Sequence, residues 1–136
     1  MSRLCLDTSA YSQFKRGHES AVEAITRARW IGVPTIVLGE LYTGFALGSR
    51  QNENMAELQR FLDNTVVQVI DVDAEVAKVY SEILIDLRQQ GTPIPTNDLW
   101  IAASAMQHGL AVLTTDRHFL NVPQVLTVLI ENSPKS

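Results

Sequence analysis

The sequence predicts an α/β fold, a three-layer α/β/α sandwich built on a mainly parallel sheet of about five strands. Short apolar runs of strand length recur along the chain. They cover residues 3–6, 30–34, 66–70, 111–114 and 125–129. Amphipathic helical patterns separate these runs, and strands that alternate with helices form parallel sheets covered on both faces. With 136 residues, the chain is expected to fold as one domain, residues 1–136.

The first elements have clear local boundaries. The strand at residues 3–6 stops at Asp7, and a short helix that begins at Tyr11 is interrupted at residues 17–18 by Gly and His. The next helix is expected over residues 19–29, because its alanine, valine and isoleucine positions form one apolar stripe.

The strand at 30–34 ends in a proline, which cannot donate to a ladder. Thr35 is expected to cap a helix over residues 36–47, whose length favours helix although its start is β-branched. A polar loop over 48–53 leads to an amphipathic helix over 54–64.

The strand at 66–70 is followed by Asp73, the expected N-cap of a long helix that ends near Gln90. A connector rich in Pro and Gly over residues 89–95 then leads to a mostly apolar helix.

That apolar helix is expected over residues 97–108. Thr96 or Asn97 is the expected N-cap, and Gly109 suits a left-handed C-cap. After the strand that follows, residues 115–120 are expected to form a turn or short helix.

Composition limits the kinds of protein this chain can be. No signal peptide or membrane span is indicated, so a cytoplasmic protein without a membrane partner is expected. Cys5 is the only cysteine, which excludes an internal disulfide, and its apolar neighbours predict a buried side chain. Residues 131–136 read as a polar tail.

Four acids lie at positions that one site would explain. Asp7 directly follows the first strand, and Asp116 follows the fourth strand after Thr115. Sites in open parallel sheets form beyond the carboxyl ends of the strands, so these two acids can meet if strands one and four are neighbours. Asp98 opens the helix before the fourth strand, and Glu40 lies in an apolar helix, where an unpartnered carboxylate is costly.

Each acid taken alone also has a purely structural interpretation. Asp7 and Asp116 can cap the helices that follow them, and Asp98 can interact with its helix dipole. Glu40 lies in mid-helix and has no such role. A structural interpretation of all four requires four coincidences, so a carboxylate cluster is favoured.

A cluster of carboxylates needs cations to offset its repulsion. Hard oxygen ligands suit Mg²⁺ or Mn²⁺, and such ions can activate water and stabilise the leaving oxygen in phosphodiester hydrolysis. The net charge of −4 argues against nucleic-acid binding through a broad basic surface. A bound metal would reverse the local sign of the site, so nucleic acid remains a possible substrate.

Four motifs carry a resemblance to a known family over essentially the whole chain. They are Leu6–Ser9, Gly39–Gly44, Asn97–Ala103 and Leu113–Phe119. In this order and spacing the chain resembles the PIN-domain ribonucleases, and among them the VapC-type toxins of bacterial toxin–antitoxin pairs.

The resemblance implies an Mg²⁺-dependent endoribonuclease that acts as a toxin, with Mn²⁺ as a possible substitute. It implies an acidic quartet, in which the metal is held by Asp7, Asp98 and Asp116, and Glu40 completes the cluster. Small polar residues of the family that hydrogen-bond the site correspond to Thr8, Asn97 and Thr115. The implied partners are an RNA substrate, an antitoxin that inserts a basic side chain toward the acids, and a second copy in a homodimer.

Other polar residues are weaker candidates for the site. The spacing of His18, His108 and His118 does not suit a zinc site. His118 lies near the proposed site and could contact substrate, but a surface or capping role is favoured. Some family members have a further acid shortly after the fourth, where this chain has His118 and Asn121, so the resemblance does not imply a second metal ion. Arg50 and Arg117 could contact phosphate or be solvated loop charges.

Apolar side chains on the helices over 36–47 and 54–64 also have two interpretations. They are Tyr42, Phe45, Met55, Phe61 and Leu62. They could belong to the core, or they could form an exposed groove for an antitoxin or a second subunit. Trp30 and Trp100 are expected in the core.

Three other kinds of protein fit the sequence less well. A receiver-like phosphorylatable module normally has a Lys near the last strand, but this chain has none between Lys78 and Lys135. A phosphatase of the haloacid type would need Asp where Ser9 stands. A degenerate family member that only binds RNA or protein is disfavoured by the intact quartet.

Overall fold

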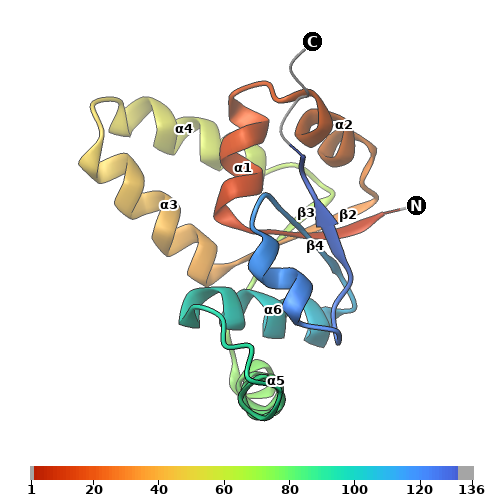
Figure 1. The fold of residues 1–136 in the computed structure, drawn as a ribbon. Coiled ribbons are helices and arrows are strands. Elements are labelled where there is room, and N and C mark those ends of the chain that lie inside the picture. The colour runs from red at the N-terminus through yellow and green to blue at the C-terminus, as the bar shows by residue number, and fades with distance from the viewer. Residues whose placement is uncertain (1, 132–136) are drawn as a thin grey trace.

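The computed structural model describes residues 2–131, so the expected tail from residue 132 onward lies outside the described residues. Over residues 2–131 the chain forms one five-stranded sheet with the order β3-β2-β1-β4-β5 (Figure 1). All four strand pairs are parallel. The strands are β1 (Arg3–Leu6), β2 (Trp30–Pro34), β3 (Val67–Ile70), β4 (Ala111–Thr114) and β5 (Thr127–Leu129). The predicted parallel sheet is confirmed.

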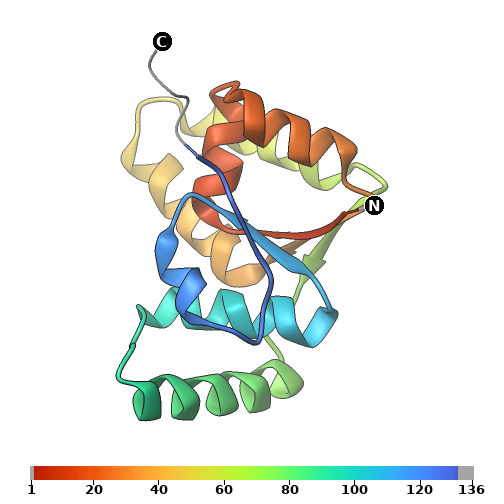
Figure 2. The ribbon, with the colours of Figure 1, turned by 45° about the vertical axis from the view of Figure 1, so that its right-hand side comes forward.

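Six α-helices and one 3₁₀ helix connect the strands within the described range. They are α1 (Thr8–Lys15), α2 (Glu19–Arg27), α3 (Thr35–Leu47), α4 (Gln51–Leu62), α5 (Ala74–Gln90), α6 (Thr96–His108) and η1 (Arg117–Asn121). Figure 1 shows α1 and α2 on one face of the sheet and α6 on the other. Figure 2 shows α6 between the sheet and α5. The predicted three-layer arrangement is confirmed.

The strand order explains where a site can form. The chain builds β1, β2 and β3 toward one edge and then places β4 on the other side of β1. The order therefore reverses between β1 and β4, where the carboxyl ends of open parallel sheets form sites. Leu6 is in register with Leu113, and the backbone N–H of Asp7 donates to the Leu113 carbonyl at 3.3 Å.

Buried side chains fix the elements that form this carboxyl edge of the sheet. Leu4, Cys5 and Leu6 of β1 are fully or almost fully buried, as expected for a strand covered on both faces. Burial raises the pKa of the Cys5 thiol, which makes Cys5 an inert core residue as predicted. The buried positions of α6, among them Ile101 and Ala102, fix that helix against the sheet.

The predicted N-caps Asp73 and Asp7 are confirmed by side-chain hydrogen bonds, and the predicted left-handed C-cap is confirmed by its backbone conformation. The Asp73 carboxylate accepts from the Val76 N–H at 3.0 Å at the start of α5. The Asp7 carboxylate accepts from the Ala10 N–H at 2.9 Å at the start of α1. Gly109 ends α6 with a φ of 65°, in the left-handed region.

Two other predicted caps are wrong. Thr96 is already the first residue of α6, and Pro95 takes the N-cap position without a side-chain hydrogen bond. Neither Thr96 nor Asn97 caps that helix, because both lie within its first turn. Thr35 likewise opens α3 from inside, and its hydroxyl instead accepts from the Val72 N–H at 3.3 Å.

Several boundaries also differ from expectation. The helix expected at 54–64 begins three residues earlier and spans Gln51–Leu62, and the helix expected at 19–29 ends at Arg27. The two tryptophans are only partly buried. Trp100 stacks on Tyr80 with ring centroids 3.9 Å apart, which joins α6 to α5. Among residues 2–131, none of the helices combines the length and apolar character needed to cross a bilayer.

Candidate active site

One pocket at the carboxyl edge of the sheet collects the predicted acids. Its lining is Asp7, Thr8, Ser9, Glu40, Asp98, Ile101, Thr115 and Asp116. All four predicted acids are present, together with two of the three predicted polar residues. The third, Asn97, reaches the site through a hydrogen bond to Glu40.

Asp7 is the most deeply buried acid, with 5% of its surface exposed. Its Oδ1 accepts from the Ala10 N–H at 2.9 Å and from the Ser9 hydroxyl at 2.7 Å, and its Oδ2 accepts from the Thr114 hydroxyl. Burial raises its pKa, and the charge of Asp116 adds to that rise, although the three hydrogen bonds act in the opposite direction. Asp7 is therefore an N-cap and a member of the acidic cluster at once.

Asp98 projects from the first turn of α6 with 18% of its side chain exposed. Burial, followed by the charges of Asp116 and Asp7, raises its pKa to about 7, while His118 opposes the rise. The helix dipole alone would favour the ionised form. Burial and the neighbouring acids therefore act against the dipole at this position.

Asp116 follows β4 and caps η1, where its Oδ1 accepts from the His118 N–H at 2.8 Å. Burial acts to raise its pKa, but hydrogen bonds from the His118 backbone, the His118 ring and Asp98 outweigh burial and lower it. Asp98 and Asp116 are thus shifted in opposite directions, which is the behaviour of two carboxyl groups that share one proton.

Glu40 has the partners that its apolar helix requires. Its Oε1 accepts from the Thr8 hydroxyl at 2.5 Å, and its Oε2 accepts from the Asn97 amide at 3.2 Å. These two bonds join α3 to α1 and α6, so the carboxylate faces the pocket in a fixed orientation.

Two hydroxyl groups that were not predicted as site residues support the cluster. Thr114 is fully buried, donates to Asp7 and accepts from the Asp116 N–H at 2.9 Å. Ser9 donates to Asp7 and accepts from the Thr115 N–H at 3.0 Å. Both residues flank a predicted acid or polar residue, but their side-chain direction required the structure.

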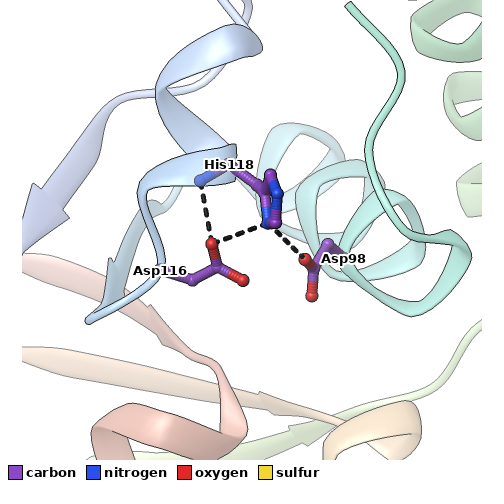
Figure 3. Close-up of side chains that lie close together, drawn as sticks. All are labelled: Asp98, Asp116 and His118. Atoms are coloured by element: carbon purple, nitrogen blue, oxygen red, sulfur yellow. Dashed lines mark hydrogen bonds and ion pairs between the residues drawn. The ribbon is translucent and has the colours of Figure 1, made fainter.

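His118 is a surface residue, as predicted, that also contacts the acids. Its side chain is 53% exposed, as a surface histidine would be, but its ring faces the acids. Figure 3 shows His118 Nδ1 between the two carboxylates, 2.8 Å from Asp116 Oδ1 and 3.9 Å from Asp98 Oδ2. The ring therefore belongs to the site.

Arg50 does not belong to the site. It pairs with Glu53 and lines a different pocket, between α1, α3 and α4. Arg117 lies beside Asp116 at the start of η1 and is exposed.

The arrangement fits a divalent cation. Four carboxylates supply hard oxygen donors, and the raised pKa values of Asp7 and Asp98 show that their negative charges are poorly compensated without a cation. The histidine ring adds one nitrogen donor. Hydrogen bonds to Asp7 and Glu40 fix the carboxylate orientation, as the outer groups of metal sites do.

Comparison with known proteins gives a consistent assignment. The PIN domain family matches residues 4–125. Ribonuclease VapC4 of Mycobacterium tuberculosis is 30% identical over 99 residues, which cover 73% of this chain and 76% of that protein. Ribonuclease VapC1 of Rickettsia felis is 30% identical over 132 residues, which cover 96% of this chain and 97% of that protein.

Solved structures agree with the sequence relatives. The crystal structure of DNA-bound VapBC from Salmonella typhimurium has a TM-score of 0.81 at 27% identity and covers 94% of this chain and 98% of that chain. The chain therefore belongs to the PIN-domain family. Within that family its similarity is to the VapC proteins.

Proposed function

We propose that this chain is an endoribonuclease that hydrolyses RNA phosphodiester bonds with Mg²⁺ and acts as the toxin of a toxin–antitoxin pair. The observation that carries the proposal is the convergence of four carboxylates in one pocket at the switch point of the sheet. Membership of the PIN-domain family and the ribonuclease relatives support the reaction class.

The ion would be held by Asp7, Asp98 and Asp116, with Mn²⁺ as a possible substitute for Mg²⁺. When bound, a divalent ion lowers the pKa of a coordinated water and offsets charge on the phosphate. Asp7 is immobilised by its three hydrogen bonds and keeps the donor set in place. Glu40, fixed by Thr8 and Asn97, can orient a ligand or a water at the edge of the pocket.

The experiment is cleavage of a panel of RNAs in Mg²⁺, in EDTA, and by Asp98→Asn in Mg²⁺. Cleavage should occur only in the first condition. Asp71→Asn, which changes an exposed acid outside the pocket, is the matched control and should cut like the wild type. Equal cleavage by the wild type in Mg²⁺ and EDTA and by Asp98→Asn would refute the assignment.

The two alternative functions that the sequence left open have less support. A receiver-like module is inconsistent with membership of the PIN-domain family. A catalytically inactive, binding-only member would not need four acids with supporting hydrogen bonds in one pocket. The cleavage experiment separates an active enzyme from such a member.

We propose an antitoxin protein as the partner that controls the site. The solved VapBC complexes with which the chain aligns support such a partner. A basic side chain of the antitoxin directed at the acids would compete with the metal. Co-expression with the product of a short neighbouring reading frame should relieve growth arrest caused by this chain, and should fail to do so if that product is not the antitoxin.

We also propose a homodimer of one-domain subunits. Apolar side chains stay exposed on α3 and α4: Tyr42 at 41%, Leu47 at 85% and Met55 at 39%. Apolar side chains that form a contiguous exposed patch commonly mark a protein interface. Light scattering should give a dimer mass for the wild type and a monomer mass for Leu47→Glu, whereas a monomeric wild type would exclude the dimer.

A further inference from the structure

We infer that His118 is a direct ligand of the metal ion and that the site therefore binds Mn²⁺ in preference to Mg²⁺. The inference rests on the proposed function, because it assumes that this pocket holds a divalent ion. It goes further in naming a nitrogen ligand and the metal that this ligand selects.

The distances suit a shared ion. His118 Nδ1 lies 2.8 Å from Asp116 Oδ1 and 3.9 Å from Asp98 Oδ2 (Figure 3), and one ligand atom from each residue lies within 4.8 Å of the others. Two ligands that are each about 2.1 Å from one ion can be at most about 4.2 Å apart. Both nitrogen–oxygen distances are below that limit.

The backbone keeps the ring beside the carboxylate. Asp116 caps η1 by accepting from the His118 N–H at 2.8 Å, so the two residues belong to one short turn. The ring is 53% exposed, so it can shift by a few tenths of an ångström without disturbing the core. Histidine binds metals through neutral imidazole, and here the nitrogen nearest the acids is Nδ1.

A nitrogen donor changes the preference between ions. Mg²⁺ strongly prefers oxygen ligands and keeps several waters. Imidazole suits first-row transition ions, and Mn²⁺ is the member of that series that also accepts a carboxylate-rich site. A site with acids alone would discriminate weakly between the two ions, whereas a histidine ligand favours Mn²⁺.

The alternative role of His118 is that of a hydrogen-bond partner that only orients Asp116. Loss of an orienting partner weakens metal binding by about 10–100-fold, so a fall in affinity alone does not identify a ligand. An orienting role affects both metals alike, and it leaves no nitrogen bonded to the ion. The test therefore compares the binding of the two metals and looks for a nitrogen bonded to the ion.

Pulsed electron paramagnetic resonance of the Mn²⁺-loaded chain should show coupling of the ion to a ¹⁴N nucleus, and His118→Gln should abolish it. His108→Gln is the matched control, because His108 lies at the opposite end of α6 from Asp98. By calorimetry, His118→Gln should weaken Mn²⁺ binding about tenfold or more and Mg²⁺ binding less than about threefold. His118→Asp should shift the preference toward Mg²⁺.

Absence of nitrogen coupling in the wild type, or equal weakening of both metals in His118→Gln, would overturn the inference. If the wild type then still cuts RNA, the proposed function stands without it. Nitrogen coupling in a chain that cuts no RNA would support His118 as a ligand and count against the proposed function.

Discussion

The carboxyl group of Asp98 lies close to two other acids, and this proximity is unfavourable in the metal-free protein. Its pKa of about 7, raised by burial and by Asp116 and Asp7, means that its charged form is disfavoured by folding. The Asp98→Asn change removes that charge and keeps the shape. In EDTA at pH 8 it should raise the free energy of unfolding by about 1 kcal/mol after allowance for solvent screening.

The same Asp98→Asn change should lower RNA cleavage about 100-fold or more, because a proposed ligand of the ion is lost. Urea unfolding and initial cleavage rates measure the two effects. Asp71→Asn, an exposed control, should alter neither by much. A variant that is destabilised in EDTA would show that the wild-type charge is compensated without metal.

The metal-free protein should also lose stability as the pH rises. Because the pKa of Asp98 goes from 3.8 to about 7 on folding, the folded state binds the extra proton between these values. Stability should therefore fall from about pH 4 to about pH 7 and level off above it. Asp7 is shifted in the same direction, and Asp116 in the opposite one.

The measurement is urea unfolding in EDTA at pH 5 and at pH 8, for the wild type and for Asp98→Asn. The decline should be smaller in the variant, which lacks the titrating group. An unchanged decline would assign the pH dependence to other residues.

Some residues of this site could be predicted from the sequence and others could not. Asp7 and Asp116 were predictable as a pair, because acids that follow two strands of a parallel sheet can meet at its carboxyl edge. Ser9 and Thr114 were not, since a hydroxyl beside an acid is common and only the local dihedral angles direct it toward Asp7. His118 could be placed near the site, but not its contact with the acids, because its ring direction depends on the 3₁₀ turn that Asp116 caps.

At the scale of elements, the pocket depends on contacts between helices. Glu40 of α3 accepts from Thr8 of α1 at 2.5 Å and from Asn97 of α6 at 3.2 Å. Thr8→Val removes one donor and frees the carboxylate to rotate. We expect kcat to fall about tenfold, at the low end of the effects seen when groups that support a metal site are lost.

A double-mutant cycle tests whether Thr8 acts through Glu40. In a Glu40→Gln background, Thr8→Val should cost little further activity, because coupled residues are not additive. Thr43→Val is the matched control on α3, since the Thr43 hydroxyl donates only to its own helix at Gly39. Additive losses would mean that Thr8 acts on the substrate independently of Glu40.

Capping signals predicted helix ends well where glycine or aspartate acted locally, as at Gly109 and Asp73. They failed at Thr96 and Asn97, where a residue of capping type is used inside the helix. Asn97 donates to Glu40 across 57 positions of sequence, and a local pattern contains no information about such a partner.

For the whole molecule, the alternation of strands and helices was enough to predict a parallel sheet but not its strand order. Asp7 and Asp116 meet only because β1 and β4 are neighbours. Both α1 and α6 pack on these two strands, from opposite faces of the sheet (Figure 2). The sequence could therefore predict that the acids form one site only on the condition that β1 and β4 are neighbours.

The same topology makes a bound cation a link between distant parts of the chain. Asp7, Asp98 and Asp116 come from the end of β1, the start of α6 and the start of η1. An ion that binds all three stabilises the folded state only, because the unfolded chain does not hold them together. At a free metal concentration about 100 times the Kd, the free energy of unfolding should rise by about 2.7 kcal/mol.

Thermal unfolding with increasing Mn²⁺ or Mg²⁺ at constant ionic strength measures this gain, and EDTA should reverse it. The Asp98→Asn variant separates stabilisation by an ion bound at the site from stabilisation by screening of surface charge, since the chain has a net charge of −4. Screening of surface charge would stabilise wild type and variant equally, and NaCl would reproduce it. If only divalent ions stabilise the protein, and only the wild type, the three acids must act together on one cation. An equal gain in stability in Asp98→Asn would contradict a metal site at the junction of β1 and β4.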